Sequence, residues 1–293
     1  MIIATGFFDG VHLGHRFLLK QLVDAASERG DRSMIVTFWP HPRNVLQDEA
    51  RNLRLLTSLE EKKALLLDLG VDTVEVLNFT KEFSRLTTEQ YLKEYIIDRF
   101  GGTAILLGYD NRIGCNPGST DEIASLAKSL GLGVIRADKF DDTAGVTISS
   151  TKIRNLLTEG DVTEASKMLG YNYSLYGVVV AGNQIGRTIG FPTANMQLYE
   201  PLKLVPACGV YCVQVETLGR KFMGMCNIGY RPTISSEHAL TIETNIFDFN
   251  EDIYGLDIRI SFITKIRDER KFSSIEVLKS QLCEDRRKCL ALI

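Results

Sequence analysis

The chain has 293 residues, of which 44% are hydrophobic and 24% charged, a composition typical of a globular protein. This length is enough for two domains that each bury a core of their own. The formal net charge of -3 argues against a general nucleic-acid or membrane-surface binder, so any phosphate binding has to be local.

No apolar run approaches the length that spans a bilayer, and the N-terminus has no basic region followed by an apolar stretch. We therefore expect a cytoplasmic protein with neither a membrane partner nor a nucleic-acid partner. The six cysteines show no CxxC pairing, so neither a zinc site nor a redox dithiol is indicated. We expect them to be reduced, and most of them to be packing residues.

Strands and helices alternate along the first half of the chain. Short apolar runs favour strands, and apolar residues at helical spacing favour helices, two of which open with capping boxes at Ser58/Glu61 and Thr87/Gln90. The alternation predicts an α/β domain whose parallel sheet is covered by helices on both faces. The expected strands are 1–7, 33–38, 71–77, 103–107 and 132–137, and the expected helices are 15–29, 58–69, 87–100 and 120–130.

Three of the four histidines, His12, His15 and His41, follow the first two expected strands. Ligands of a parallel sheet lie beyond the carboxyl ends of its strands. His12 and His15 also stand at the start of a helix, where free backbone amides and the helix dipole favour an anion. This arrangement suits the phosphates of ATP. The alternative is that His15 merely begins the helix and His12 is solvated.

Further polar residues follow the later strands. Asp110 comes after the fourth strand, where its carboxylate could accept a hydrogen bond from a ribose hydroxyl or an amine. Ser149, Ser150 and Thr151 precede a helix, with Arg154 one turn inside it. Hydroxyls at such a position are normally N-caps, but beside an arginine they can equally hold a polyphosphate.

Helices are expected to continue over 151–157 and 162–169, and the domain boundary is placed near Tyr171. Beyond it the pattern changes to strands with short turns, which predicts an antiparallel meander closed into a small β-barrel. A final helix with the capping box Ser273/Glu276 is expected to pack on the barrel. The expected strands are 173–180, 209–216, 221–228, 240–249 and 256–263, and the expected helix is 273–290.

The stretch GRTIGFPTAN, residues 186–195, opens this half. Its glycines let backbone amides approach a phosphate closely, and Thr193 and Asn195 offer hard oxygen ligands of the kind that Mg²⁺ prefers. Taken by itself, the stretch could also be an ordinary loop rich in glycine and proline.

Four motifs of the first half resemble the nucleotidyltransferase module of the bacterial bifunctional riboflavin kinase/FAD synthetases. They are TGFFDGVHLGH (5–15), TFWPHP (37–42), LLGYDNRIG (106–114) and ISSTKIR (148–154). The resemblance implies a Rossmann-like domain over residues 1–170 that adenylylates FMN with ATP and releases pyrophosphate. It implies a flavin-facing loop of Pro40, His41 and Pro42, and ATP contacts from Gly6, Asp9, His12, His15, Asp110, Ser150, Thr151 and Arg154. His12 and His15 would be the catalytic pair. Phe7, Asn111 and Ile113 depart from the family's usual residues.

Five motifs of the second half resemble the riboflavin kinase module of the same family: GVVVAGNQIGRTIGFPTAN (177–195), PACGVYCVQV (206–215), CNIGYRPTI (226–234), TIETNIFDF (241–249) and IRDERKF (266–272). The resemblance implies that residues 171–293 transfer the γ-phosphoryl group of ATP to riboflavin. Glu243 would be the general base, Thr193 and Asn195 would hold Mg²⁺, and Arg267 would contact the flavin phosphate. Gly182, Gly186, Gly190 and Thr193 would surround the ATP phosphates. Asn245 stands where many relatives have histidine and receives no role.

The partners that the resemblance implies are ATP, riboflavin and FMN, and we expect a monomer or weak homo-oligomer. Two alternatives stay open at this point. One is a nucleotidyltransferase for another small phosphate ester, with a barrel that only binds flavin. The other is a flavin sensor without turnover, but it would be expected to lack Glu243 or the His12/His15 pair, and both are present.

Overall fold

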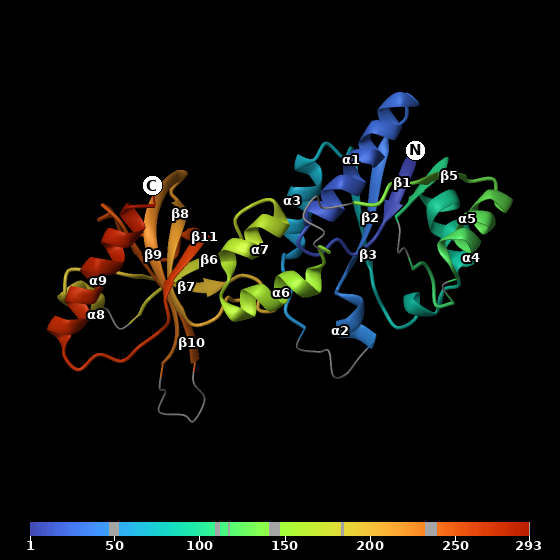
Figure 1. Ribbon diagram of the computed structural model, residues 1–293. Coiled ribbons are helices and arrows are strands. Elements are labelled where there is room, and N and C mark those ends of the chain that lie inside the picture. Colours follow the sequence, from blue (N-terminus) through green and yellow to red (C-terminus); the bar gives the residue numbers. More distant parts are fainter. Residues whose placement is uncertain are drawn as a thin grey trace. The chain divides into compact units, whose positions relative to one another are not determined.

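The computed structural model of the chain describes residues 1–46, 53–108, 112–116, 118–140, 147–182, 185–231 and 239–292. The chain divides into two compact units, Met1–Ser150 and Thr151–Ile293 (Figure 1). Asp110 and Asn111, to which the sequence drew attention, lie outside the described residues.

The first unit is built on a parallel sheet of five strands in the order β3-β2-β1-β4-β5. This confirms the α/β prediction. Because β1 lies in the middle and the chain moves outward from it in both directions, strand order reverses at β1, which is where sheets of this type bind ligands. The strands are β1 (Ile2–Thr5), β2 (Ser33–Trp39), β3 (Thr73–Asn78), β4 (Ala104–Leu107) and β5 (Gly133–Arg136).

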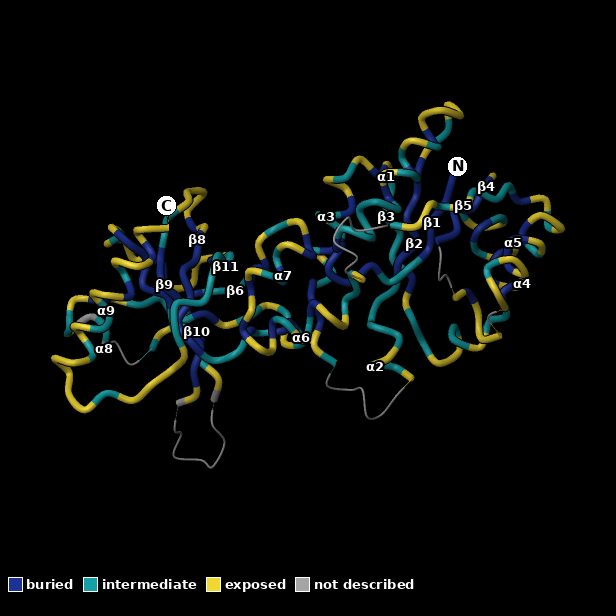
Figure 2. Tube along the Cα trace, viewed as in Figure 1, coloured by how far each residue is buried: buried dark blue, intermediate teal, exposed yellow. Residues whose placement is uncertain are grey.

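Helices cover both faces of this sheet, since alternate residues of each strand belong to different cores. Ile2 of β1 packs in one core with Leu19 and Leu66, whereas Ile3 packs in the other with Leu92 and Ile123. Figure 2 shows β1, β2 and β4 largely buried, the edge strands β3 and β5 mostly intermediate, and the outer helix faces exposed. The helices are α1 (Leu13–Glu28), α2 (Pro42–Leu46), α3 (Leu59–Asp68), η2 (Phe83–Arg85), α4 (Thr88–Gln90) with its continuation η3 (Tyr91–Arg99), and α5 (Thr120–Ser129).

Both predicted capping boxes of the first unit are present. The Ser58 hydroxyl accepts from the Glu61 amide at 3.2 Å, and the Glu61 carboxylate accepts from the Ser58 amide at 2.7 Å. Thr87 and Gln90 make the same reciprocal pair at 3.2 and 2.9 Å. Local sequence therefore fixes where these two helices begin.

The second unit contains a closed antiparallel barrel in the order β10-β7-β6-β11-β8-β9. The barrel was predicted, but the simple meander was wrong: β6 pairs with β7, and β8, β9 and β10 follow one another, but β11 returns between β6 and β8, and β10 closes the barrel on β7. The prediction also missed β7. The strands are β6 (Ser174–Val180), β7 (Ala194–Leu198), β8 (Gly209–Thr217), β9 (Arg220–Arg231), β10 (Ala239–Ile246) and β11 (Asp257–Arg267).

The helices of the second unit are α6 (Ser150–Glu159, whose first residue belongs to the first unit), α7 (Val162–Leu169), α8 (Ile185–Thr188) and α9 (Ile275–Leu290). The predicted C-terminal helix is present, but its predicted cap was wrong by one residue. Ser274 is the N-cap, and its hydroxyl accepts from the Val277 amide at 3.3 Å. Among the described helices, none combines the length and the apolarity that a bilayer crossing requires.

Candidate active sites

The loop after β1 is held by the buried carboxylate of Asp9. Its oxygens accept hydrogen bonds from the Leu56 amide at 3.0 and 3.1 Å and from both the amide and the hydroxyl of Thr57 at 3.1 Å. The Gly10 amide donates to the same hydroxyl at 3.2 Å. Asp9, which the resemblance assigned to ATP, therefore shapes this loop by tying it to residues far along the chain.

This loop also carries backbone strain. Phe8 and Val11 have φ angles of 53° and 37°, in the left-handed region that residues with a branched or bulky side chain rarely adopt. Such strain persists only where surrounding contacts hold the backbone in that conformation, and it is common at functional sites. The Asp9 hydrogen bonds supply that constraint. Gly6 is required nearby, because an added Cβ would lie 2.9 Å from the Phe8 ring.

His12 and His15 meet at the N-terminus of α1. Their rings stack with centroids 3.6 Å apart, and Nδ1 of His12, the N-cap, accepts from the His15 amide at 3.4 Å. Burial, with His12 and Lys62 nearby, holds the pKa of His15 well below its usual value, so that His15 is neutral at neutral pH. Its Nδ1 is buried and has no hydrogen-bond partner among the described residues. The pair therefore places a polar group without a described partner at a helix N-terminus.

Lys62 is the residue of this region that the sequence analysis missed. It is only 1% exposed, and its Nζ donates to the carbonyls of Phe7 and Phe38 at 3.1 and 3.2 Å, joining the chain beyond β1 to the end of β2. The same Nζ lies 4.0 Å from the centre of the Phe7 ring. One signal was available: Lys62 stands four residues before Leu66, on the apolar side of α3.

Burial lowers the pKa of Lys62 to about 8 from 10.5, and the nearby Asp9 offsets only part of this effect. Between these pH values the unfolded chain binds more protons than the folded one, so the contribution of Lys62 to stability rises with pH. We expect the stability of the wild type to increase by about 3 kcal/mol relative to the Lys62→Met variant from pH 8 to 10.5. Trp39 is the only tryptophan and lies 5.8 Å from Nζ, so its fluorescence follows unfolding of the first unit.

The control for this experiment is Lys63→Met, because Lys63 is the next residue on the same helix and its side chain is 38% exposed. Its stability should run parallel to that of the wild type throughout this pH range. The same parallel behaviour in Lys62→Met would contradict the assignment of a buried, titrating charge to Lys62.

The remaining residues that were predicted for the site of the first unit lie on two segments. His41 packs edge-on against Phe7 with centroids 4.0 Å apart, between Pro40, which follows β2, and Pro42, which begins α2. Ser150 begins α6, and its hydroxyl donates to the Asp9 carbonyl at 2.9 Å. Thr151 and Arg154 are the next residue and the next turn of α6, and Thr151 is exposed. The structure thus brings His41 to Phe7, and Ser150 to the Asp9 loop.

Two cavities flank β10 in the second unit. Successive side chains of a strand point to opposite faces. Accordingly, Thr244 and Ile246 line one cavity, of about 310 Å³, and Glu243 and Asn245 line another, of about 280 Å³. Thr193 lines both cavities. If each cavity held a ligand, a chemical group transferred from one ligand to the other would therefore be transferred beside Thr193.

The predicted kinase residues converge beside this threonine. The Thr193 hydroxyl donates to Glu243 Oε2 at 3.4 Å, and Glu243 is the register partner of Asn195 across the β7–β10 pair. On its other side, Glu243 pairs with Asn227 of β9, which lines the same cavity and was not predicted. Three strands therefore position this group.

The glycines of the motif are needed for close packing. A Cβ on Gly182 would lie 2.3 Å from Asn195 Nδ2, and one on Gly186 would lie 2.2 Å from the Phe191 carbonyl oxygen. Gly190 has a φ of +85°, and the Phe191 amide then donates to the Gly186 carbonyl at 2.8 Å. The loop that was predicted to surround phosphates is thus a short helix and a turn that lead into β7.

The second cavity, which contains Glu243, has a largely apolar wall. Asn245 is buried, and its side-chain amide donates to the Pro192 carbonyl at 2.7 Å, so it supports the loop before Thr193. Arg267 reaches the cavity from the end of β11. The apolar residues of the lining are Ile189, Phe191, Val210, Met225, Phe272, Leu278 and Leu282. A flat apolar ring would fit such a wall.

Comparison with known proteins agrees with the division of the chain into two units. The riboflavin kinase family matches residues 169–293, and the FAD synthetase family matches residues 1–152. The bifunctional riboflavin kinase/FMN adenylyltransferase of Listeria monocytogenes is 39% identical over 97% of this chain and 90% of its own length. That of Bacillus subtilis is 36% identical over 99% and 91%.

Among solved structures, one from Streptococcus pneumoniae, described as a macrolide-efflux protein, has a TM-score of 0.90. It is 33% identical and covers 98% of this chain and 92% of its own. Because these relatives match over nearly the whole chain, we exclude the two alternatives left open by the sequence, a flavin sensor without turnover and a nucleotidyltransferase for another phosphate ester. The chain therefore belongs to the family of bifunctional riboflavin kinase/FMN adenylyltransferases, with the FAD synthetase part at the N-terminus and the riboflavin kinase part at the C-terminus.

Proposed function

We propose that riboflavin is phosphorylated at Thr193, where the two cavities beside β10 meet. The cavity with the apolar wall and Glu243 would hold riboflavin, and the cavity on the other face would hold ATP. The observation that carries this assignment is that Thr193 lines both cavities while its hydroxyl contacts Glu243 at 3.4 Å.

In this arrangement Glu243 accepts the proton of the riboflavin 5′-hydroxyl. The hydroxyl oxygen forms a bond to the γ-phosphorus as the bond to the β–γ bridging oxygen breaks, so FMN and ADP are the products. Little further covalent chemistry is asked of the protein, because positioning and charge stabilisation lower most of the barrier. Positioning by strands β7, β9 and β10 suits that requirement.

Thr193 and Asn195 are the residues that we propose to hold Mg²⁺. Their hydroxyl and amide oxygens form a hard donor set, as Mg²⁺ requires, and Glu243 adds a carboxylate close by. Within the described part of the chain, no cluster of three or more His, Cys, Asp or Glu is arranged to hold a metal. Mg²⁺ typically takes few protein ligands and completes its shell with phosphates and water, where it would neutralise phosphate charge.

Gly182 tests the role of Asn195. Replacing Gly182 with Ala places a Cβ 2.3 Å from the Asn195 amide nitrogen, so the amide must move. We expect phosphorylation of riboflavin to fall by about tenfold or more, with a raised Mg²⁺ requirement. Gly219→Ala is the control: nothing lies within 4 Å of an added Cβ there, and although the φ of +69° makes alanine strained in that turn, the Mg²⁺ requirement should stay unchanged. An unchanged Mg²⁺ dependence in Gly182→Ala would count against Asn195 as a ligand.

For the first unit, we propose that ATP phosphates bind at the N-terminus of α1. A phosphate oxygen of FMN would attack the α-phosphorus of ATP, and pyrophosphate would leave. The buried, unpartnered Nδ1 of His15 and the helix N-terminus support this placement. Ser150, Thr151, Arg154 and Asp110 complete the proposed ATP contacts, and Pro40, His41 and Pro42 the proposed flavin contacts.

Further parts of the assignment are also proposals. We place the adenylyltransferase at residues 1–170 and the kinase at 171–293, which is compatible with family matches that end at 152 and begin at 169. We infer a cytoplasmic location, because both reactions consume ATP, and we propose a monomer or weak homo-oligomer. The net charge of -3 supports small-molecule partners rather than nucleic acid.

A time course with riboflavin, ATP and Mg²⁺, followed by separation of the flavins, tests the sequence of reactions. FMN should appear first and FAD after it. Supplying FMN in place of riboflavin should give FAD without a lag. FAD formation from riboflavin without any transient FMN would contradict two separate sites.

A further inference from the structure

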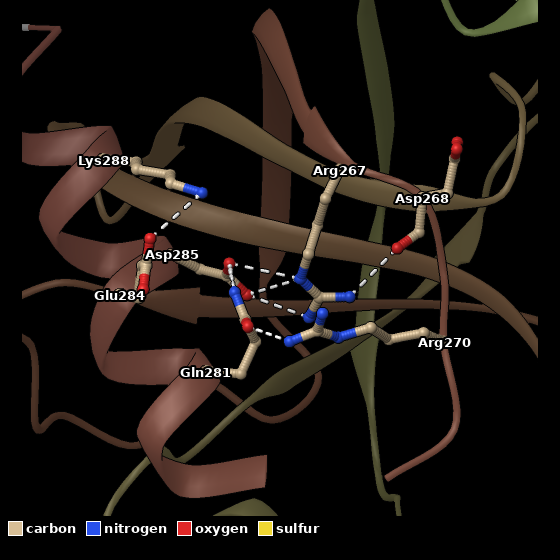
Figure 3. A network of polar contacts seen from close by, with 7 residues as sticks. All are labelled: Arg267, Asp268, Arg270, Gln281, Glu284, Asp285 and Lys288. Carbon is tan, nitrogen blue, oxygen red and sulfur yellow. Dashed lines mark hydrogen bonds and ion pairs between the residues drawn. The ribbon is translucent and has the colours of Figure 1, made fainter. Parts of the chain in front are cut away.

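A buried ion pair fastens α9 to the end of β11 (Figure 3). Asp285 is fully buried, and the side chain of Arg267 is 15% exposed. Nε of Arg267 donates to both carboxylate oxygens of Asp285, at 3.2 and 2.9 Å, and Nη2 lies 2.9 Å from Oδ2. This is the two-pronged geometry that gives arginine–carboxylate pairs their directionality.

Neighbouring groups complete the network around this pair. Gln281 Nε2 donates to Asp285 Oδ1 at 2.7 Å, and Arg270 donates to the Gln281 side-chain oxygen. Nη1 of Arg267 donates to the Asp268 carbonyl at 3.0 Å. Figure 3 shows the guanidinium of Arg267 between the end of its strand and the helix. Both carboxylate oxygens and all three guanidinium nitrogens are therefore engaged.

Stability alone is a weak reason for such a pair, because removing two charges from water offsets much of their attraction. The C-terminal turns of α9, next to Asp285 and beyond it, also have contacts of their own. Cys289 is fully buried and its carbonyl lies 3.9 Å from Cys212 Sγ, while Arg286 pairs with Asp248 at 2.7 Å. The helix would therefore stay attached without Asp285, and the pair is left with a geometric role.

The part of α9 that the pair fixes is a wall of the second cavity. Leu278 and Leu282 stand seven and three residues before Asp285, on the same helix face, and both line that cavity together with Glu243. Arg267 lines it as well. A shift of α9 would thus move the apolar wall relative to the base.

We propose that Asp285 is a positioning residue of the riboflavin kinase reaction, which through Arg267 sets the distance between the α9 wall and Glu243. The proposal rests on the assignment of the second cavity to riboflavin. Arg267 then acts mainly as the link between strand and helix. Loss of this link weakens the binding of riboflavin more than the binding of ATP. No residue of α9 lines the cavity that we propose for ATP.

The test is Asp285→Asn in the full chain, with kcat and the KM values of riboflavin and ATP measured separately. We expect the riboflavin KM to rise about tenfold or more, with the ATP KM and FMN adenylylation within about twofold of the wild type. Glu284→Gln is the matched control, since Glu284 is the preceding residue, is 49% exposed and pairs with Lys288 at 3.3 Å. It should leave all four quantities unchanged.

A second variant covers the case in which Asp285→Asn does not fold. Gln281→Met removes one hydrogen-bond partner of Asp285 and the acceptor of Arg270, while the Arg267–Asp285 ion pair stays intact. It should raise the riboflavin KM about threefold, in the same selective way. An unchanged riboflavin KM in the folded variants overturns the proposal, and so does an equal loss of affinity for both substrates.

Failure of the cavity assignment would look different. Leu282→Ala alters the wall directly, so it should raise the riboflavin KM whether or not Asp285 matters. If Leu282→Ala raises that KM and Asp285→Asn does not, only the positioning role is wrong. If neither changes it, riboflavin binds elsewhere and the positioning role is wrong as well.

Discussion

Replacing Glu243 with Gln is expected to lower riboflavin phosphorylation by at least about 100-fold, because a proposed general base is lost while the size of the side chain is kept. A glutamine oxygen can still accept from the Thr193 hydroxyl, so the strands around it should not move. The loss should fall on kcat rather than on the KM of riboflavin. Formation of FMN from riboflavin and ATP is the measurement.

The same chain supplies an internal control. FAD formation from added FMN should stay at the wild-type rate in Glu243→Gln. A matched control on the barrel is Glu216→Gln, whose side chain is exposed on β8 and lines neither cavity. Substantial phosphorylation by Glu243→Gln would remove Glu243 as the base, and loss of both activities would mean that the units do not work independently.

Replacing both His12 and His15 with Ala is expected to have the converse effect. FMN adenylylation should fall by about 100- to 1,000-fold, since two polar groups at the proposed phosphate site are removed. Riboflavin phosphorylation should persist, so that FMN accumulates. A chromatographic comparison of FMN and FAD over time distinguishes this pattern from a general loss of activity.

Folding has to be separated from chemistry in this experiment, because His12 is the N-cap of α1. His12→Asn, combined with His15→Ala, keeps a side chain that caps helices well. Trp39 fluorescence then reports whether the first unit is folded. A folded variant that still makes FAD from FMN at the wild-type rate would exclude the histidine pair from the adenylylation site.

Much of the fold could be predicted because its signals are local. The capping box of Ser58 and Glu61 and the alternation of strands with helices set the elements and class of the first unit. The order of strands in the barrel could not be predicted in this way. β7 begins directly after Pro192 and Thr193, in a segment rich in turn-forming residues, and its strand character comes from pairing with β6 and β10.

The site residues also differ in whether the sequence or only the tertiary structure reveals them. The motif residues Thr193 and Glu243 do converge, although Thr193 lies just before β7 and Glu243 on β10. Lys62 and Asp285 were missed because a charged residue on a helix is expected to face solvent. For Lys62 the spacing to Leu66 was a weak signal of burial, whereas the burial of Asp285 is visible only in its tertiary contacts. Asp9 was assigned to ATP from the resemblance of its motif, and its hydrogen-bond partners at 56 and 57 could not be foreseen because they lie far along the chain.

The ties of Asp9 also have a consequence for the order of events during folding. Its hydrogen bonds join residues 47 and 48 positions apart, and Lys62 reaches Phe7 across 55 positions. A loop with strained residues at Phe8 and Val11 gains little from local contacts before these long-range partners arrive. The Asp9 loop and the adenylylation site that we propose beside it should therefore be among the last parts of the first unit to form. During refolding, adenylylation activity should return later than the secondary structure of this unit.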